Sequence, residues 1–471
     1  MEAQRSKVLQ DETLRALISR WQGQLICPSD GHYDEARAVW NGMIDKHPAI
    51  IARCATVADV ITAVHFAREN DLLVAVRGGG HNVAGSAVCD DGLVIDLSLM
   101  EGIQVDQEAR IARAQGGVIW RELDAATQAF GLATPGGVVS DTGIAGLTLG
   151  GGFGWLRRKY GSSCDNLISV DVVTADGRLL KASATGNADL FWGIRGGGGN
   201  FGVVTAFEYR LHPIGPEVMV AFVLYPAKQA KEALAFYRDY TATAPDEVSC
   251  FAILGTIPTT VSFPAELHGQ PYVCFAAMYA GTIEEGERVL QPLREFSTPL
   301  VDFSAPMPYV QAQLLYDEDY PAGTLRYYWK SLYLDSLSSD AMDCLIAAAS
   351  NRPSSHSTVD IWQMGGAVSR VSADDSALGG RQAPYLLGVE ANWEEQHKDE
   401  ANIAWTRKCI EDMQPFSDGS EYLNFPGFLE KGEETLRRTF GIKYERLVDL
   451  KNKYDPTNLF RLNANITPTM P

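Results

Sequence analysis

Hydrophobic and polar positions follow two different patterns along the chain. After a short amphipathic opening within residues 1–45, the apolar run 49–53 predicts a strand, and the helical spacing of apolar residues over 57–69 predicts an amphipathic helix. The run 72–76 predicts a buried strand, and 92–97 predicts another. This order of elements is typical of a β-α-β unit.

The same pattern continues as far as about residue 213. A second β-α stretch is predicted over 112–130, and 170–182 predicts a hairpin whose turn contains Asp176 and Gly177. From about residue 217 to 420, strand-like apolar runs alternate with helical stretches such as 228–240. We therefore expect an α+β fold: an α/β region followed by one with a mostly antiparallel sheet backed by helices.

Composition narrows the classes of function. The 471 residues carry a net charge of −19, and so acidic a surface repels phosphate backbones and anionic membranes, which makes nucleic acid an unexpected partner. No apolar run reaches about 18 residues, so no membrane span is expected. The first residues lack the apolar segment of a signal peptide, and we expect a cytoplasmic protein. The eight cysteines form no C-x-x-C pair and are expected to be free thiols, and no residue cluster has the spacing of metal ligands.

Three glycine clusters are candidates for ligand binding. The first, Arg77 to Asn82 followed by Gly85 and Ser86, lies between two predicted strands, where consecutive glycines allow backbone N–H groups to form an anion nest. The second, 136–154, has aliphatic spacers suited to a planar apolar ligand. The third, 196–202, matches GxGxxG but leads into a strand, so we interpret the match as accidental as a dinucleotide-binding fingerprint. Each cluster taken alone also fits ordinary tight turns.

Taken in order, five stretches carry a specific resemblance: RGGGHNVAGSA, TGIAGLTLGGGFGWL, KYGSSCDNL, LFWGIRGGGGNFGVVT and KYDPTNLFRLNANI. They resemble the berberine-bridge-enzyme-like branch of the vanillyl-alcohol-oxidase flavoproteins. The resemblance implies an N-terminal extension (1–44) packing on a two-part PCMH-type FAD-binding domain (45–215). It also implies a substrate domain (216–420) and a C-terminal segment (421–471) that returns to the FAD domain. The implied function is that of an FAD-dependent oxidase.

The resemblance also implies how FAD is held. His81 matches the histidine that such enzymes join to the 8-alpha methyl group of the flavin, and Arg77 is expected to keep its imidazole neutral. Many relatives add a cysteine link to flavin carbon 6, but Val139 stands at that position, so a single covalent link is expected. Cys164 is interpreted as a structural thiol. Thr142 matches a position beside the reactive edge of the flavin, where relatives tune oxygen access.

The remaining expected cofactor contacts follow the order of the motifs. Around the diphosphate they are Arg77, Gly78, Gly79, Gly80, Asn82, Gly85 and Ser86; around the flavin ring, Gly137, Thr142, Gly143, Gly146, Gly150, Gly151, Gly152, Gly154 and Tyr422; and elsewhere on the cofactor, Asp165, Asn166, Gly202, Val203, Val204, Asn463 and Asn465.

Two residues are candidates for the base that takes a substrate proton. Tyr422 stands in a Tyr-x-Asn motif whose tyrosine faces the flavin in similar enzymes, although a buried core tyrosine explains it too. Along 385–393, period two places Gly388, Glu390 and Asn392 on one face and apolar residues on the other, which directs Glu390 to the cavity unless it lies at a solvated edge.

The leading hypothesis is an oxidase that transfers hydride from a sugar, alcohol, amine or secondary metabolite to flavin N5 and then electrons to dioxygen. Two alternatives stay open. One is a dehydrogenase or oxidative cyclase that uses another acceptor, and the other is a catalytically silent flavin-binding or small-molecule-binding protein. The oligomeric state stays open as well.

Overall fold

The β-α-β unit predicted near the start of the chain forms the first sheet. The structure is a computed structural model that describes residues 21–428 and 432–469, so most of the predicted amphipathic opening lies outside it. β2 and β3 each pair in parallel with β4, and β1 adds an antiparallel edge. Helix α4 has the predicted bounds and begins with a capping box, in which Thr56 and Asp59 satisfy each other's backbone N–H groups. The bounds are β1 Gln24–Ile26, α3 Tyr33–Arg37, β2 Ile50–Arg53, α4 Val57–Glu69, β3 Val74–Arg77 and β4 Leu93–Asp96.

A second, five-stranded sheet is entirely antiparallel, in the order β5-β6-β10-β8-β9. The predicted hairpin is present as β8 and β9. The bounds are β5 Ile103–Asp106, β6 Ile111–Gln115, α5 Trp120–Gln128, β7 Leu132–Ala133, α6 Ile144–Leu149, α7 Arg157–Tyr160, β8 Leu167–Val173, β9 Leu179–Ser183, α8 Ala188–Ile194, β10 Val203–Arg210 and β11 His212–Pro213.

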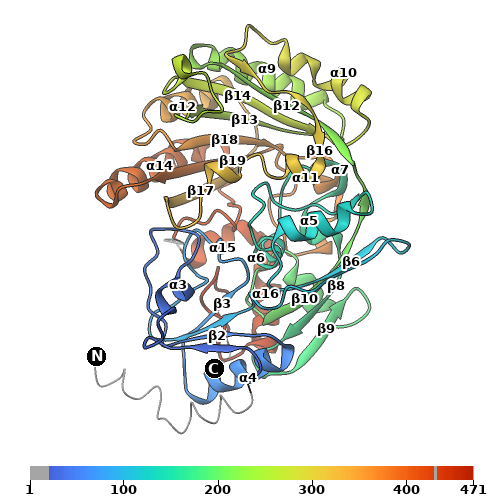
Figure 1. The fold of residues 1–471 in the computed structure, drawn as a ribbon, viewed down its shortest axis with the longest axis vertical. Coiled ribbons are helices and arrows are strands. Elements are labelled where there is room, and N and C mark those ends of the chain that lie inside the picture. The colour runs from blue at the N-terminus through green and yellow to red at the C-terminus, as the bar shows by residue number, and fades with distance from the viewer. Residues whose placement is uncertain (1–20, 429–431, 470–471) are drawn as a thin grey trace.

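The third sheet has eight antiparallel strands, and four helices cover one of its faces (Figure 1). Its order is β15-β12-β14-β13-β18-β19-β17, with β16 also paired to β12. The bounds are β12 Glu217–Pro226, α9 Ala230–Thr243, β13 Val248–Thr256, β14 Pro271–Tyr279, α10 Ile283–Arg294, β15 Val301–Asp302, β16 Ala305–Pro308, α11 Tyr309–Ala312, β17 Arg326–Leu334, α12 Ser339–Ser350, β18 Thr358–Gln363, α13 Ala367–Arg370, β19 Tyr385–Trp393 and α14 Asp399–Met413. The expected α+β fold with a helix-backed antiparallel sheet is confirmed.

Strand alternation decides which side chains of this sheet face the helices. On β19, Leu387, Val389 and Ala391 belong to the core shared with α9, α10, α12 and α14. Gly388 and Glu390 therefore project from the opposite face, toward the first two sheets. The period-two pattern predicted this division of the strand.

The C-terminal part of the chain returns to the second sheet. Helices α15 (Glu433–Phe440) and α16 (Tyr444–Tyr454) bury Leu436 and Leu447 in the same core as Phe191 and Trp192 of α8. In Figure 1 these red helices lie in the lower half, among blue and green elements that are distant in sequence.

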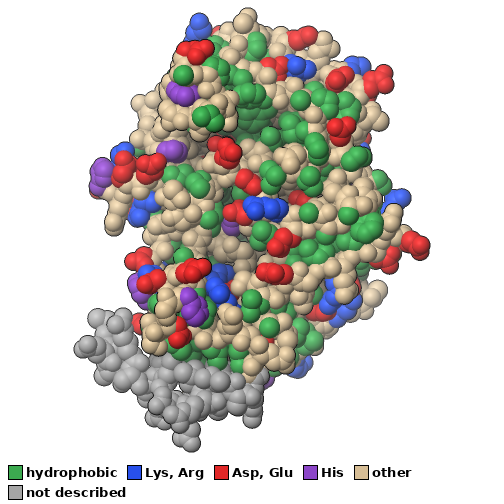
Figure 2. Space-filling view, viewed as in Figure 1, with side chains coloured by type: hydrophobic (Ala, Val, Ile, Leu, Met, Phe, Trp, Pro, Cys, Tyr) green, Lys and Arg blue, Asp and Glu red, His purple; other side chains and the backbone are tan. Residues whose placement is uncertain are grey.

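Among the described residues, no helix is both long and apolar enough to cross a bilayer, and no group of three metal-ligating side chains comes together. All eight cysteines are free. Acidic and basic side chains are interspersed over the face seen in Figure 2.

Candidate active site

A cavity lies between the first two sheets and the open face of the third. All three glycine clusters reach it, as do two pieces of the C-terminal segment and one face of the third sheet. The expected site residues that line it are Gly78, Gly79, Gly80, His81, Asn82, Ser86, Gly137, Thr142, Gly143, Gly146, Gly150, Gly202, Val204, Glu390, Tyr422 and Asn463. The structure therefore brings most of the expected residues to one place.

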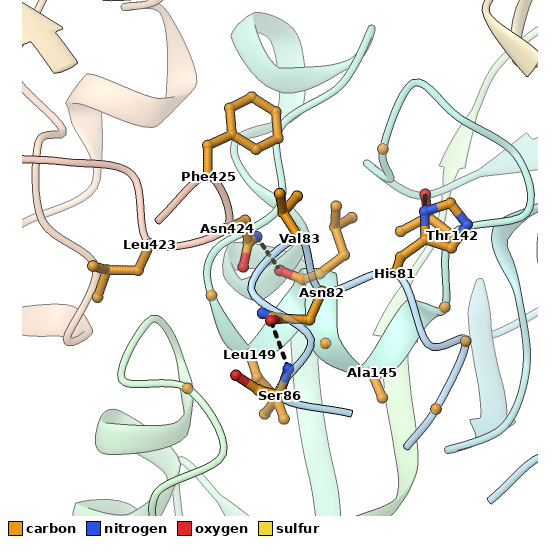
Figure 3. Close-up of a pocket in the computed structure, with 18 of the residues that line it drawn as sticks. His81, Asn82, Val83, Ser86, Thr142, Ala145, Leu149, Leu423, Asn424 and Phe425 are labelled. Atoms are coloured by element: carbon orange, nitrogen blue, oxygen red, sulfur yellow. Dashed lines mark hydrogen bonds between the residues drawn. The ribbon is translucent and has the colours of Figure 1, made fainter. Parts of the chain in front are cut away.

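The first two glycine clusters lie against each other. A Cβ atom on Gly143 would lie 2.3 Å from the backbone nitrogen of Gly79, and one on Gly79 would lie 2.4 Å from that of Gly143. Neither backbone can move aside, so only glycine fits at these two positions. The turn that follows is held by Asn82, whose Oδ1 accepts the N–H of Ser86 at 3.1 Å (Figure 3).

Arg77 departs from its expected role. Its guanidinium is buried and donates to Asp96 Oδ2 at 2.8 Å and to the Ala36 carbonyl at 2.7 Å, and Arg77 is not among the residues that line the cavity. The cause is strand register, because Arg77 of β3 lies opposite Asp96 of β4. A buried guanidinium requires acceptors, and this carboxylate supplies one. Arg77 therefore braces the first sheet and does not line the cavity.

His81 instead has an acidic neighbour, which the sequence analysis missed. Asp141 Oδ1 lies 2.8 Å from His81 Nε2, and Thr142 Oγ1 lies 3.5 Å from Nδ1, so His81 and Thr142 stand side by side in Figure 3. Burial acts to raise the pKa of the Asp141 carboxyl, but the interaction with His81 outweighs it and the net shift is downward. Trp40 stacks on the imidazole with a centroid separation of 4.8 Å. Asp141 lies two residues after Val139 in the same motif, and this position in the sequence could have indicated that Asp141 reaches the cavity.

Two expectations concern the second covalent link, one at Val139 in the second cluster and one at Cys164 in a later loop. Val139 lines the cavity, whereas Cys164 is fully buried beside Ser162 and is not a lining residue. Burial raises the pKa of the Cys164 thiol to about 12, so it is held as an inert thiol.

Several expected cofactor residues do not line the cavity: Arg77, Gly85, Gly151, Gly152, Gly154, Asp165, Asn166, Val203 and Asn465. Asp165 is paired with Arg381 at 2.6 Å. The Asn166 amide donates to the carbonyls of Tyr160 and Ser162, both at 2.9 Å. Asp165 and Asn166 thus hold a loop in place, because buried polar groups must find partners and these find them within the protein.

The C-terminal segment closes one side of the cavity. Tyr422 Oη accepts the N–H of Gly152 at 3.1 Å and an amide N–H of Asn424 at 2.8 Å. Asn424 also donates to the Leu147 carbonyl at 3.1 Å, which joins this segment to α6. Burial raises the pKa of Tyr422, although its two donors oppose that shift. A base needs a lowered pKa, so this environment disfavours Tyr422 in that role.

The third sheet contributes a pair of buried carboxyl groups, Glu390 on β19 and Asp360 on β18. Both line the cavity, and their exposed fractions are 3% and 6%. Tyr320 Oη donates to Glu390 Oε2 at 2.7 Å. Burial raises the pKa of both carboxyls, and the negative charge of Glu390 raises that of Asp360 further. Asp360 was not predicted from the sequence. Its strand nevertheless shows the same alternation as β19, because Thr358, Asp360 and Trp362 are separated by apolar residues.

The cavity also fits FAD. A Cβ on Gly146 or Gly199 would meet no atom within 4 Å, so these backbones face open space that a flat ring or a phosphate can approach. Asn463 lines the same space, and its buried Oδ1 has no hydrogen-bond partner among the described residues. Glycine backbone amides together with an unpaired acceptor suit a diphosphate and the polar edge of a flavin.

Comparison with known proteins identifies the family. Residues 48–183 match the FAD binding domain model, and residues 421–467 match the berberine and berberine-like model. An FAD-linked oxidoreductase of Dictyostelium discoideum is 33% identical over 434 residues, covering 91% of each chain. The solved structure of 6-hydroxy-D-nicotine oxidase from Arthrobacter nicotinovorans superposes with a TM-score of 0.85 at 27% identity, covering 95% of this chain and 98% of that one. A chitooligosaccharide oxidase superposes equally well (TM-score 0.85) at 22% identity over 97% and 100% of the two chains. The chain is a member of the berberine bridge enzyme-like family of FAD-linked oxidoreductases.

Proposed function

We propose that this oxidoreductase holds FAD through one covalent bond from His81, oxidises a small organic substrate and returns the electrons to dioxygen. The observation that carries the proposal is the position of His81, at the end of the glycine turn, lining the cavity and in contact with Asp141. Val139 occupies the position of the second link in related sequences, and a valine side chain cannot form that bond.

Bound flavin would supply the acceptor for a hydride taken from the substrate. The chain's own residues would do the rest. Backbone amides of Gly78–Gly80 and Gly196–Gly199 line the cavity and would hold the diphosphate, and Asn463 would offer the Oδ1 acceptor that has no partner among the described residues. Thr142, beside His81, is proposed to influence how dioxygen reaches the flavin edge.

The base is proposed to be the carboxyl pair of Glu390 and Asp360. A carboxyl whose pKa is raised toward neutrality accepts a proton more readily than an ordinary carboxylate does. Tyr422 has the opposite problem, since burial moves the pKa of its hydroxyl further above neutral pH. We assign Tyr422 the role of a positioning residue that joins Gly152 to Asn424.

The link to His81 is tested by a peptide map of the purified protein. We expect a flavin adduct on the His81 peptide alone, and in His81→Ala a flavin that is released on denaturation. An adduct on another peptide, or no adduct in the wild-type protein, contradicts the proposal.

The acceptor is tested separately. The substrate-reduced enzyme is mixed with dioxygen or with a quinone while reoxidation of the flavin is followed. Fast reoxidation by dioxygen with release of hydrogen peroxide is expected for an oxidase. Reoxidation by the quinone alone would identify a dehydrogenase or an oxidative cyclase that uses another acceptor, and redox-neutral conversion of substrate without either acceptor would identify a cyclase that uses the flavin for an internal rearrangement. No flavin reduction by any substrate of a broad panel would favour a silent binding protein.

A further inference from the structure

The open face of the third sheet gathers acidic and aromatic side chains from four neighbouring strands. In the register of the sheet, Phe251 of β13 lies opposite Trp362 of β18. Asp360 of β18 lies opposite Gly388 of β19, and Glu390 of β19 lies opposite Trp329 of β17. These positions share one face, so their side chains form a continuous wall of the cavity.

Gly388 lets the two carboxyl groups approach each other. A Cβ on Gly388 would lie 3.3 Å from Glu390 Oε1 and 3.8 Å from Asp360 Cβ, so a larger residue would stand between them. Tyr320 supports Glu390 from outside the sheet. The carboxyl pair is therefore a built feature of this wall. Asp360 of β18 and Glu390 of β19 supply the two groups, and Gly388 of β19 leaves room for both.

Within the described part of the chain, no ion pair compensates the two carboxyl groups. Among residues 21–428 and 432–469, neither Asp360 nor Glu390 forms an ion pair with Lys, Arg or His. Arg157 lies behind Trp362, at 5.4 Å from its ring centroid, and its guanidinium is taken by the carbonyls of Gly154, Cys250 and Gln363. Arg352 donates to Thr256 and to the Ala349 carbonyl. Buried negative charge without a counter-ion is costly, and a bound cation would relieve that cost.

Three buried polar atoms on lining residues lack hydrogen-bond partners within the described part of the chain. They are Asp360 Oδ1, Trp362 Nε1 and Tyr316 Oη, on residues whose exposed fractions are 6%, 4% and 8%. Buried polar groups are normally paired, so this cluster of unpaired atoms beside one cavity indicates a ligand that pairs with them.

Aromatic rings surround the carboxyl pair. Trp329 packs edge to face on Tyr320 and on Phe425, each with a centroid separation of 5.3 Å. Trp362 packs in the same way on Phe251 at 4.6 Å. Ring faces attract cations through their quadrupoles, and the attraction is stronger where water is excluded. A carboxyl pair enclosed by such rings is suited to an ammonium group that carries apolar substituents.

We propose that the wall formed by Asp360, Glu390, Trp329 and Trp362 recognises an organic cation, so that the substrate is an amine bound through its positively charged nitrogen. The inference rests on the proposed function, since it takes this cavity to be the substrate site. A sugar ring needs many paired donors and acceptors, and this wall consists mainly of rings with its polar groups gathered at one point.

The groups that face the carboxyl pair set its response to pH. They are Asp319 and Tyr320 from the segment before β17, Tyr272 from β14, Tyr316 and Arg352. Among them only Arg352 is cationic, so the pair loses its proton above the usual carboxyl range. Affinity for a cation should therefore rise with pH while that proton is lost.

The test measures binding to the flavin-loaded enzyme by calorimetry. The probes are benzylamine and benzyltrimethylammonium, with benzyl alcohol as the neutral counterpart. We expect each cation to bind at least tenfold more tightly than the alcohol. Because the charge of benzyltrimethylammonium does not titrate, its affinity should increase from about pH 5 to about pH 8. If neither cation binds more tightly than benzyl alcohol, the inference is wrong.

Two variants test whether the carboxyl pair causes the preference for the cation. Asp360→Asn and Glu390→Gln are each expected to remove most of the preference for the cation, whereas Glu394→Gln, an exposed carboxylate just beyond β19, should keep it. Flavin content and the circular dichroism spectrum show whether each variant is folded. An unchanged preference in both folded cavity variants overturns the inference. Binding needs neither the His81 bond nor dioxygen, so the proposed function can fail while the cation preference stands, and the reverse holds too.

Discussion

The two walls of the cavity are built in different ways. The cofactor wall consists largely of glycine backbone from three loops, with His81 and Asn82 among its few polar side chains. The substrate wall consists of side chains from β13, β17, β18 and β19, which span residues 248–393. A backbone wall suits a cofactor that is the same in every relative. A side-chain wall can change its chemistry without disturbing the cofactor site.

The largest effect is expected from the substrate wall. Glu390→Gln removes a proton acceptor and should lower the rate of flavin reduction by about 10²–10⁴-fold. The amount of bound flavin should not change, because Glu390 has no contact with the glycine loops. Anaerobic stopped-flow with the best substrate of a panel measures the rate, and Glu394→Gln is the matched control. A loss of flavin in Glu390→Gln would show that the two walls are not independent.

The next effect should come from the cofactor wall. Gly143→Ala places a methyl group against the backbone of Gly79, and overpacking of this kind costs about 1–3 kcal/mol. Thermal unfolding should detect the loss, together with a lower flavin content. Gly31→Ala, at an exposed turn where a Cβ meets nothing within 4 Å, should change stability by less than about 0.5 kcal/mol. Equal stability of the two variants would contradict the close approach of the loops.

Tyr422 joins the two walls, because its hydroxyl accepts the N–H of Gly152 and its own N–H donates to Ser331 of β17, and it should show an intermediate effect. Tyr422→Phe leaves the N–H of Gly152 and the amide of Asn424 without their acceptor, at a cost of about 1–2 kcal/mol. Turnover should fall by less than tenfold if Tyr422 only positions its neighbours. A fall as large as that of Glu390→Gln would return the role of base to Tyr422.

The smallest effect is expected on the way the stability of the folded protein depends on pH. The pKa of Asp360 is raised in the folded protein, so protonation of Asp360 stabilises the fold. That stabilisation is complete below the unfolded pKa of about 4 and is lost as the pH rises through the folded value. Asp360→Asn should therefore match the stability of the wild type near pH 4 and exceed it near pH 8. Unfolding midpoints at the two pH values test this, and a variant that is less stable at both would contradict it.

The difference between the walls also explains what the sequence could predict. Glycine loops are local, so the motifs of the resemblance could predict that Gly78–Gly80, Gly143 and Gly146 lie together at one cavity. The role of Arg77 could not be predicted in this way, because its partner Asp96 is defined by strand pairing. Glu390 was found from alternation within one strand. Asp360 was not predicted, because its role depends on β18 lying beside β19, and only the order of the strands in the sheet defines that neighbour.

The location of the C-terminal lining has a consequence for biogenesis. Residues 422–425 and 460–464 supply part of the cavity, yet ribosomes make them after all three sheets. During synthesis the glycine loops are therefore complete long before the pocket has its final side. A flavin captured in the fully lined cavity would therefore require that residues up to 464 have already been synthesised.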